Sequence, residues 1–305
     1  MVNYRMRMEE MMDILRTLLL TPGNREKLLE KTKVLPADAI ILDLEDSVPP
    51  AEKEAARKMV AHYIPQVAAA GQRVYVRINS LKTPYAVKDI KAIVVKGLQG
   101  IVLPKPDSAE DIKMAGYLLG EAEADAGIEK GTVKILPIVE SPEGIINVNQ
   151  IARAPRVTVL NFGPEDFLRE MGVGHSDDGM EIYYPRMAIA IACHAAGIMA
   201  IDGVYFDWNN KEGLIKDSMA AKKLGYQGKF VVTAGQIETV NKVFSPSAEE
   251  IAQARRIIET LEAGEREGAG ITYLDGRMVD IPVADGARKV LALAEEIKKR
   301  DKRKL

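Results

Sequence analysis

Apolar residues gather in short runs along this chain, separated by longer stretches of mixed polarity. Within each run nearly every position is apolar, rather than every second one. Continuous runs of this kind are typical of parallel strands that are buried on both faces of a sheet. The pattern predicts strands at residues 16–20, 39–42, 74–79, 100–105, 134–139, 157–162, 198–201 and 230–232.

The stretches between these strands carry helix signals. Pro49 and Pro50 precede the segment 51–70, and proline suits the first turn of a helix. Ser108 is placed to cap another helix. Eight strand–helix repeats within roughly 230 residues match the size of a (β/α)8 barrel. The predicted fold class is therefore α/β, a (β/α)8 TIM barrel with a C-terminal helical lid segment.

The alternation of strands and helices ends near residue 245. A Ser-x-x-Glu capping sequence at Ser247 begins a helix, and the turn Asp275-Gly276 separates two short runs that precede a last helix. This helix–hairpin–helix order does not continue a barrel. We predict a TIM-barrel catalytic domain over residues 1–245 and a lid or oligomerisation segment over residues 246–305.

Composition narrows the classes of function. The net charge of −2 gives no general attraction to nucleic acid or to a membrane surface, so neither is expected as a partner. No apolar run approaches the roughly 20 residues that span a bilayer. Cys193 is the only cysteine, which excludes a disulfide framework and favours a cytoplasmic location.

Two of the predicted strands are followed by an acidic residue next to Gly or Pro. Glu140 comes directly after the strand 134–139, and Asp166 comes shortly after the strand 157–162. In β/α barrels the catalytic groups lie at the C-terminal ends of the strands, so these two carboxylates can lie side by side. Together they would suit a divalent cation that needs oxygen ligands, such as Mg²⁺. The alternative is that both acids cap the helices that follow them.

Other predicted strands also carry charges at or near their ends. Charges in such places are costly to bury unless they are paired or bind a ligand. The set contains both signs, which suits a metal ion together with a carboxylate-bearing substrate; the alternative is a group of ion pairs that tie loops together. These residues are Arg16, Asp43, Glu45, Asp46, Arg77, Lys105, Asp202 and Lys229.

Several short motifs, in a fixed order along the chain, indicate a specific protein family. They are Arg16-Thr-Leu-Leu-Leu-Thr-Pro-Gly23, Leu42-Asp-Leu-Glu-Asp-Ser-Val48, Val76-Arg-Ile-Asn79, Leu103-Pro-Lys105, Glu140-Ser-Pro-Glu-Gly144, Gly163-Pro-Glu-Asp166 and Gly276-Arg-Met-Val-Asp-Ile-Pro282. With these motifs the chain resembles the citrate lyase β-subunit-like members of the HpcH/HpaI aldolase family. The resemblance extends over nearly the whole chain.

The resemblance implies a Mg²⁺-dependent carbon–carbon lyase. Its substrate would be a citryl-, citramalyl- or malyl-type thioester of CoA or phosphopantetheine, cleaved to an acetyl thioester and a 2-oxo acid. By position, Glu140 and Asp166 would bind the metal, and Arg77 would hold the substrate and stabilise the enolate. The other implied roles are cofactor binding by Arg16, Arg25 and Lys31, support of Arg77 and the metal-bound waters by Glu45 and Asp46, and protonation by a lid acid, Asp280, that reaches a neighbouring subunit.

The sequence leaves several alternatives open. The segment after the eighth strand, Val232 to Ile237, lacks the His-Pro or Asn-Pro pair that many relatives carry there, so the carrier could be CoA or an acyl carrier protein. Net synthase or thioesterase activity is a second possibility, and a subunit active only within a citrate lyase-type complex is a third. The family also implies a homo-oligomer, a trimer or a dimer of trimers. The identity of the 2-oxo acid is not predicted.

Overall fold

The structure is a computed structural model that describes residues 14–176, 178–266, 268 and 271–303. The chain divides into two compact units, one of which is Leu15–Asn241 and the other of which contains the C-terminal residues from Lys242 onward. The first 13 residues, which the sequence assigned to the barrel domain, lie outside the described residues. In the described part of the chain, no helix combines the length and the apolar character needed to cross a membrane.

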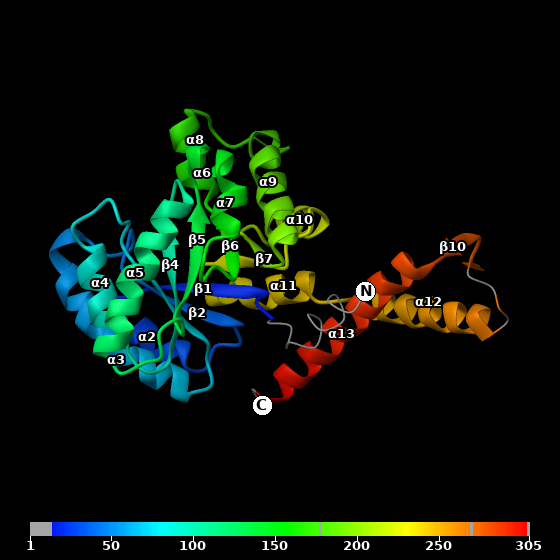
Figure 1. Cartoon of the computed structure of the whole chain (residues 1–305), viewed down its shortest axis with the longest axis horizontal. Helices are drawn as coiled ribbons and strands as arrows, with labels where there is room; N and C mark the ends of the chain where they lie inside the picture. The colour runs from blue at the N-terminus through cyan, green and yellow to red at the C-terminus, as the bar shows by residue number, and fades with distance from the viewer. Residues whose placement is uncertain (1–13, 177, 267, 269–270, 304–305) are drawn as a thin grey trace. The chain divides into compact units, whose positions relative to one another are not determined.

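The first unit is a closed barrel of eight parallel strands, with helices around it (Figure 1). Each strand pairs with the next one in the chain, and β8 closes the barrel by pairing with β1. This confirms the predicted TIM barrel. The strands are β1 (Thr17–Pro22), β2 (Ala39–Asp43), β3 (Val74–Arg77), β4 (Leu98–Pro104), β5 (Lys134–Val139), β6 (Val159–Phe162), β7 (Met199–Asp202) and β8 (Gly228–Val231).

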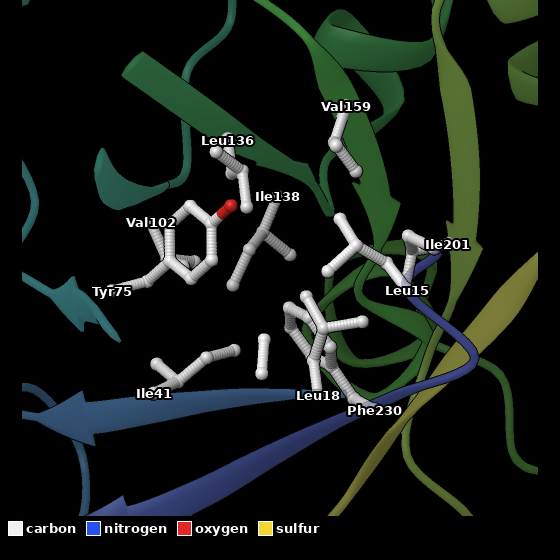
Figure 2. Packing of buried hydrophobic residues seen from close by; sticks show 11 residues of the cluster. Leu15, Leu18, Ile41, Tyr75, Val102, Leu136, Ile138, Val159, Ile201 and Phe230 are labelled. Atoms are coloured by element: carbon white, nitrogen blue, oxygen red, sulfur yellow. The ribbon is translucent and has the colours of Figure 1, made fainter. Parts of the chain in front are cut away.

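The interior of the barrel is a packed apolar core. Figure 2 shows side chains from all eight strands converging on one another, among them Leu18, Tyr75 and Phe230. Burying this apolar surface on both faces of the sheet explains why the strands read as continuous apolar runs rather than alternating ones. The core also gives the strand ends a rigid base, because a close-packed interior resists small displacements.

Helices connect the strands, and two of them were not predicted. The helix α8 follows β6 and carries Asp166, and α11 follows β8. The sequence predicts one helix over residues 141–151, but the structure has two short helices that meet at Asn147, whose side-chain amide donates a hydrogen bond to the Asp107 carbonyl. The helices are α2 (Glu26–Thr32), η1 (Pro50–Glu52), α3 (Lys53–Ala69), α4 (Ala86–Ile93), α5 (Ala109–Asp125), α6 (Pro142–Ile146), α7 (Val148–Ala152), α8 (Pro164–Met171), α9 (Met180–Ala196), α10 (Lys211–Lys223) and α11 (Ala234–Phe244).

The C-terminal unit contains a helix pair and a hairpin. The helices α12 (Ala248–Arg266) and α13 (Ile281–Arg303) pack against each other, and the antiparallel strands β9 (Thr272–Leu274) and β10 (Arg277–Val279) lie between them in the chain. Ser247 and Glu250 form the predicted capping pair at the start of α12. A small core of Leu261, Val279 and Ala284 joins the helices to the hairpin.

Candidate active site

Five consecutive strands of the barrel each deliver a charged side chain at or just beyond their C-terminal ends. Asp43 and Arg77 are the last residues of β2 and β3, Lys105 and Glu140 directly follow β4 and β5, and Asp166 lies in the first turn of α8 after β6. Because neighbouring strands are parallel, their C-terminal ends lie on one face of the barrel, where TIM-barrel enzymes have their active sites.

Arg77 is held by the acids that follow β2. Its Nε and Nη2 donate hydrogen bonds to the two carboxylate oxygens of Asp43 at 2.6 and 2.7 Å, a forked arrangement that fixes the guanidinium plane. Its Nη1 lies 3.2 Å from Glu45 Oε2 and 3.9 Å from Asp46 Oδ2. Burial is the largest single influence and raises the pKa of Asp43, but the charge of Arg77 and the hydrogen bonds from Arg77, Ser47 and the Glu45 N–H together lower the pKa overall.

Lys105 lies among three carboxylates. Its Nζ donates to Glu45 Oε1 at 3.2 Å and lies 3.5 Å from Asp166 Oδ2, while its backbone N–H donates to Glu140 Oε1 at 3.0 Å. We call Glu45, Glu140 and Asp166 the carboxylate cluster. Arg169 on α8 also forms an ion pair with Asp166, and most of that arginine side chain is exposed to solvent.

The carboxylate cluster carries more negative charge than its neighbours neutralise. Glu140 is only 6% exposed, and its pKa is raised well above the usual value, first by burial and then by the charges of Glu45 and Asp166. The pKa of Glu45 is also raised, mainly by burial, although Arg77 and Lys105 act against it. A bound cation would relieve this repulsion.

The helix-cap alternative can be checked at both acids. Ser141, not Glu140, caps α6, because its hydroxyl accepts the Gly144 N–H at 2.9 Å. Asp166 lies in the first turn of α8, which has Gly163 at its N-cap and no side-chain capping bond. Gly163 also makes room for the carboxylate, since a Cβ at that position would collide with Glu140 Oε2. Neither acid acts as a helix cap.

The donor set consists of carboxylate oxygens, which suit a hard cation such as magnesium. Within the described residues, no three His, Cys, Asp or Glu side chains group in a way that could hold a metal ion. Magnesium needs fewer protein ligands, because it keeps several waters and commonly binds through one or two carboxylates together with substrate oxygens. Glu140 and Asp166, two hard oxygen donors at the mouth of the barrel, meet that requirement.

The three predicted cofactor-binding cations lie in different places. Arg25 precedes α2 and Lys31 lies in its last turn, and both are exposed on the segment that follows the C-terminal end of β1. Arg16 instead precedes β1, at the opposite end of the strand, and is buried in an ion pair with Asp38 in which Nε lies 2.8 Å from Oδ2. The structure therefore gives no support to a cofactor role for Arg16.

Asp280 belongs to the C-terminal unit. It lies between β10 and α13, and its Oδ1 accepts the Val283 N–H at 3.2 Å, so it caps α13. Its proposed catalytic role stays a prediction. Asp46, which was predicted to support Arg77, has a side chain that is 64% exposed.

A second group of charges fills the space between β7, β8, α9 and α10. Lys229 Nζ lies 2.5 Å from Asp202 Oδ2 and 2.6 Å from Asp217 Oδ2, and Arg186 pairs with the same two acids. We call these four residues the balanced cluster, because two cations face two carboxylates. Lys229 lies near the start of β8 rather than at its end, so the salt-bridge alternative accounts for it and Asp202.

Asp43 and Lys105 are central to the site. The sequence listed both among the charged strand ends, but it assigned neither a specific role. In the structure Asp43 and Arg77 are in register on adjacent strands. The contacts of Lys105 depend on a backbone φ of 55°, a left-handed conformation that is uncommon outside glycine.

Comparison with known proteins places this site in a family. The model of the HpcH/HpaI aldolase/citrate lyase family matches residues 16–234, which is most of the chain. The chain belongs to this family. The resemblance inferred from the motifs is thereby confirmed, and the matched residues include every strand of the barrel.

Individual family members are similar over almost their full length. The chain is 36% identical to the citrate lyase subunit beta of Haemophilus influenzae, covering 93% of this chain and 98% of that one. It is 33% identical to the L-malyl-CoA/beta-methylmalyl-CoA lyase of Rhodobacter capsulatus, covering 93% and 95%. A crystal structure of the family protein CitE from Mycobacterium tuberculosis, in complex with magnesium, acetoacetate and coenzyme A, superposes with a TM-score of 0.75 at 28% identity, covering 92% and 98%.

Proposed function

We propose that this protein is a Mg²⁺-dependent carbon–carbon lyase that cleaves a citryl-, citramalyl- or malyl-type thioester to an acetyl thioester and a 2-oxo acid. The observation that carries the proposal is the carboxylate cluster, in which the buried Glu140 lies among like charges beside Lys105 and near the fixed Arg77. The names of the family relatives, which include a citrate lyase subunit and a malyl-CoA lyase, support the same reaction class.

Glu140 and Asp166 would hold the metal. When bound there, Mg²⁺ supplies a Lewis acid that lowers the pKa of a coordinated substrate hydroxyl. Loss of that proton allows the carbon–carbon bond to break, so that the oxygen becomes the carbonyl of the 2-oxo acid and the electron pair passes to the thioester as an enolate. Protonation of the enolate carbon then gives the acetyl thioester, so the proton lost from the hydroxyl is balanced by one gained on carbon.

Arg77 is placed to stabilise the developing negative charge. Its guanidinium is already oriented by Asp43 and Glu45, so it need not reorganise during the reaction. Glu45 also accepts from Lys105 and thereby couples the two cations, and Asp46 supports the group from the solvent side. We assign protonation of the enolate carbon to Asp280, and the lid role of residues 246–305 belongs to the same proposal.

Arg25 and Lys31 are the cations we propose for the phosphates of the carrier, either CoA or the phosphopantetheine of an acyl carrier protein. Both are exposed, as residues that bind a mobile phosphate group must be. A cytoplasmic homotrimer, alone or within a citrate lyase-type complex, completes the proposal. In that assembly the Asp280 of one subunit would serve the site of another.

The test is direct measurement of turnover with Mg²⁺. Purified protein is supplied with citramalyl-CoA and with malyl-CoA, and with acetyl-CoA plus pyruvate or glyoxylate for the reverse reaction. We expect cleavage that chelation abolishes. Glu140→Ala should reduce kcat/KM at least about 10³-fold, since it removes a metal ligand. Glu143→Ala, which changes an exposed glutamate on α6, is the matched control and should keep its activity.

The other outcomes separate the alternatives. Free malate or citramalate together with CoA as products, without a 2-oxo acid, would indicate thioesterase activity in place of carbon–carbon cleavage. Turnover that begins only when a loaded acyl carrier protein is added would identify a subunit of a larger complex. Absence of Mg²⁺-dependent turnover with both kinds of carrier would overturn the proposal.

A further inference from the structure

Lys105 contacts both proposed metal ligands, whereas the exposed Arg169 pairs with Asp166. The ammonium group of Lys105 lies 3.5 Å from Asp166 Oδ2 and 3.2 Å from Glu45 Oε1, and its own backbone N–H holds Glu140. One residue therefore contacts all three members of the carboxylate cluster. Its side chain is 28% exposed, so water reaches the ammonium group without screening it fully.

The backbone at Lys105 is strained in a way that serves these contacts. Its φ is 55°, and among the described non-glycine residues only Arg156 and Asp275 also have a positive φ. Glycine would adopt this conformation with less strain. Strain of this kind concentrates at functional sites, where the surroundings hold the backbone in place. Here the conformation directs the N–H and the ammonium group of the same lysine toward the carboxylates.

A positive charge in this position has two opposite effects. Without a metal it offsets the repulsion among Glu45, Glu140 and Asp166, and so it favours the assembled cluster. If Glu140 and Asp166 held a divalent ion, the ammonium group, which lies 3.5 Å from Asp166 Oδ2, would be a like charge that competes for Asp166. Arg77 acts less directly, because Asp43 occupies two of its nitrogens.

We propose that Lys105 is a built-in counter-cation, a positioning residue that keeps the carboxylate cluster assembled in the metal-free protein and weakens Mg²⁺ binding by competing for Asp166. The inference rests on the metal site of the proposed function. In this inference Lys105 controls the affinity of the site for Mg²⁺, whether or not the lysine also takes part in the reaction.

The test compares metal binding and stability without using activity. Lys105→Met removes the charge, Lys105→Arg keeps it, and Lys113→Met removes an exposed lysine on α5 as the matched control. Calorimetric titration with MgCl2 should show at least fivefold tighter binding by Lys105→Met than by the wild type. In EDTA the same variant should melt several degrees lower, and saturating Mg²⁺ should abolish that difference. Lys105→Arg and Lys113→Met should behave like the wild type.

The outcomes distinguish this inference from the metal site itself. Unchanged or weaker Mg²⁺ binding by Lys105→Met, with binding intact in the wild type, overturns the role of Lys105 alone. A wild type that binds no Mg²⁺ overturns the metal site and the inference with it. If Lys105→Met does not fold, Lys105→Gln gives the same neutral test with a polar side chain.

Discussion

The two charge clusters of the barrel are built from the same residue types but differ in balance. In the balanced cluster, Arg186 and Lys229 face Asp202 and Asp217, and Lys229 is fully buried. At the mouth of the barrel, five carboxylates face the two cations Arg77 and Lys105, with Arg169 reaching Asp166 from the solvent side. Those carboxylates are Asp43, Glu45, Asp46, Glu140 and Asp166.

The difference in charge balance distinguishes a structural cluster from a cluster that is expected to bind a ligand. A buried ion pair with matched charges is a closed unit that needs no further partner, whereas a surplus of one sign costs stability until a ligand arrives. The balanced cluster therefore serves the fold, and the surplus at the mouth is the feature expected of a cation site. This contrast predicts that neutralising a carboxylate has opposite effects on stability in the two places.

The largest effect is expected at Lys229. Lys229→Met leaves Asp202 and Asp217 with only Arg186, and removal of one partner from a buried pair costs about 3–5 kcal/mol. Urea unfolding at pH 7 measures this loss. Lys223→Met, which changes an exposed lysine on α10, is the control and should fall within about 0.5 kcal/mol of the wild type. A loss below about 1 kcal/mol in Lys229→Met would mean that the cluster is no stronger than a surface pair.

A smaller effect is expected at Asp217, and it depends on pH. Burial raises the pKa of Asp217, but Lys229 and Arg186 outweigh it and lower the pKa from 3.8 to about 2. A lowered pKa in the folded state means that the stabilisation is complete above about pH 4 and is lost as pH falls through 2. At about 1.4 kcal/mol per pKa unit, Asp217→Asn should lose about 2 kcal/mol at pH 6.

Urea unfolding between pH 6 and pH 2.5 tests that prediction. The free energies of unfolding of the wild type and Asp217→Asn should converge as the pH falls. A difference that stays constant over the whole range would show that hydrogen bonding, rather than the charge of Asp217, stabilises the balanced cluster.

The smallest effect has the opposite sign and is expected at Glu140. The pKa of Glu140 is raised in the folded state, first by burial, so its ionised form destabilises the metal-free protein at neutral pH. Glu140→Gln keeps the acceptor for the Lys105 N–H and removes the charge, and it should stabilise the protein in EDTA by about 0.5–2 kcal/mol. Glu143→Gln is the exposed control. Destabilisation by Glu140→Gln would contradict the surplus of negative charge.

The barrel could be predicted from the sequence because its signal is repeated. Strands buried on both faces give apolar runs, and all eight appear in the structure within a few residues of the predicted positions. The helix α8 was missed, because its sequence, Pro164 to Met171, is short and mostly polar. That omission affected the site, since Asp166 lies in the first turn of α8 rather than at the end of β6.

The site could be predicted only in part. Glu140 and Arg77 stand at strand ends, where the chain order of a barrel fixes their neighbours. The role of Lys105 depends on a local backbone conformation between Pro104 and Pro106, and no periodic pattern reports it. Arg16 and Lys229 were wrongly grouped with the C-terminal strand ends, because Arg16 precedes β1 and Lys229 is the second residue of β8.

The double contact of Arg77 with Asp43 has a consequence for selectivity. An unrestrained arginine loses roughly 2 kcal/mol of rotamer entropy when it is fixed against a ligand. In this protein the loss occurs during folding, because Nε and Nη2 are already bound to Asp43. A thioester of the right shape meets a guanidinium that is immobile before it arrives. A misfitting one cannot draw the arginine toward itself, so discrimination between substrates is expected to arise from rigidity rather than from a change of conformation.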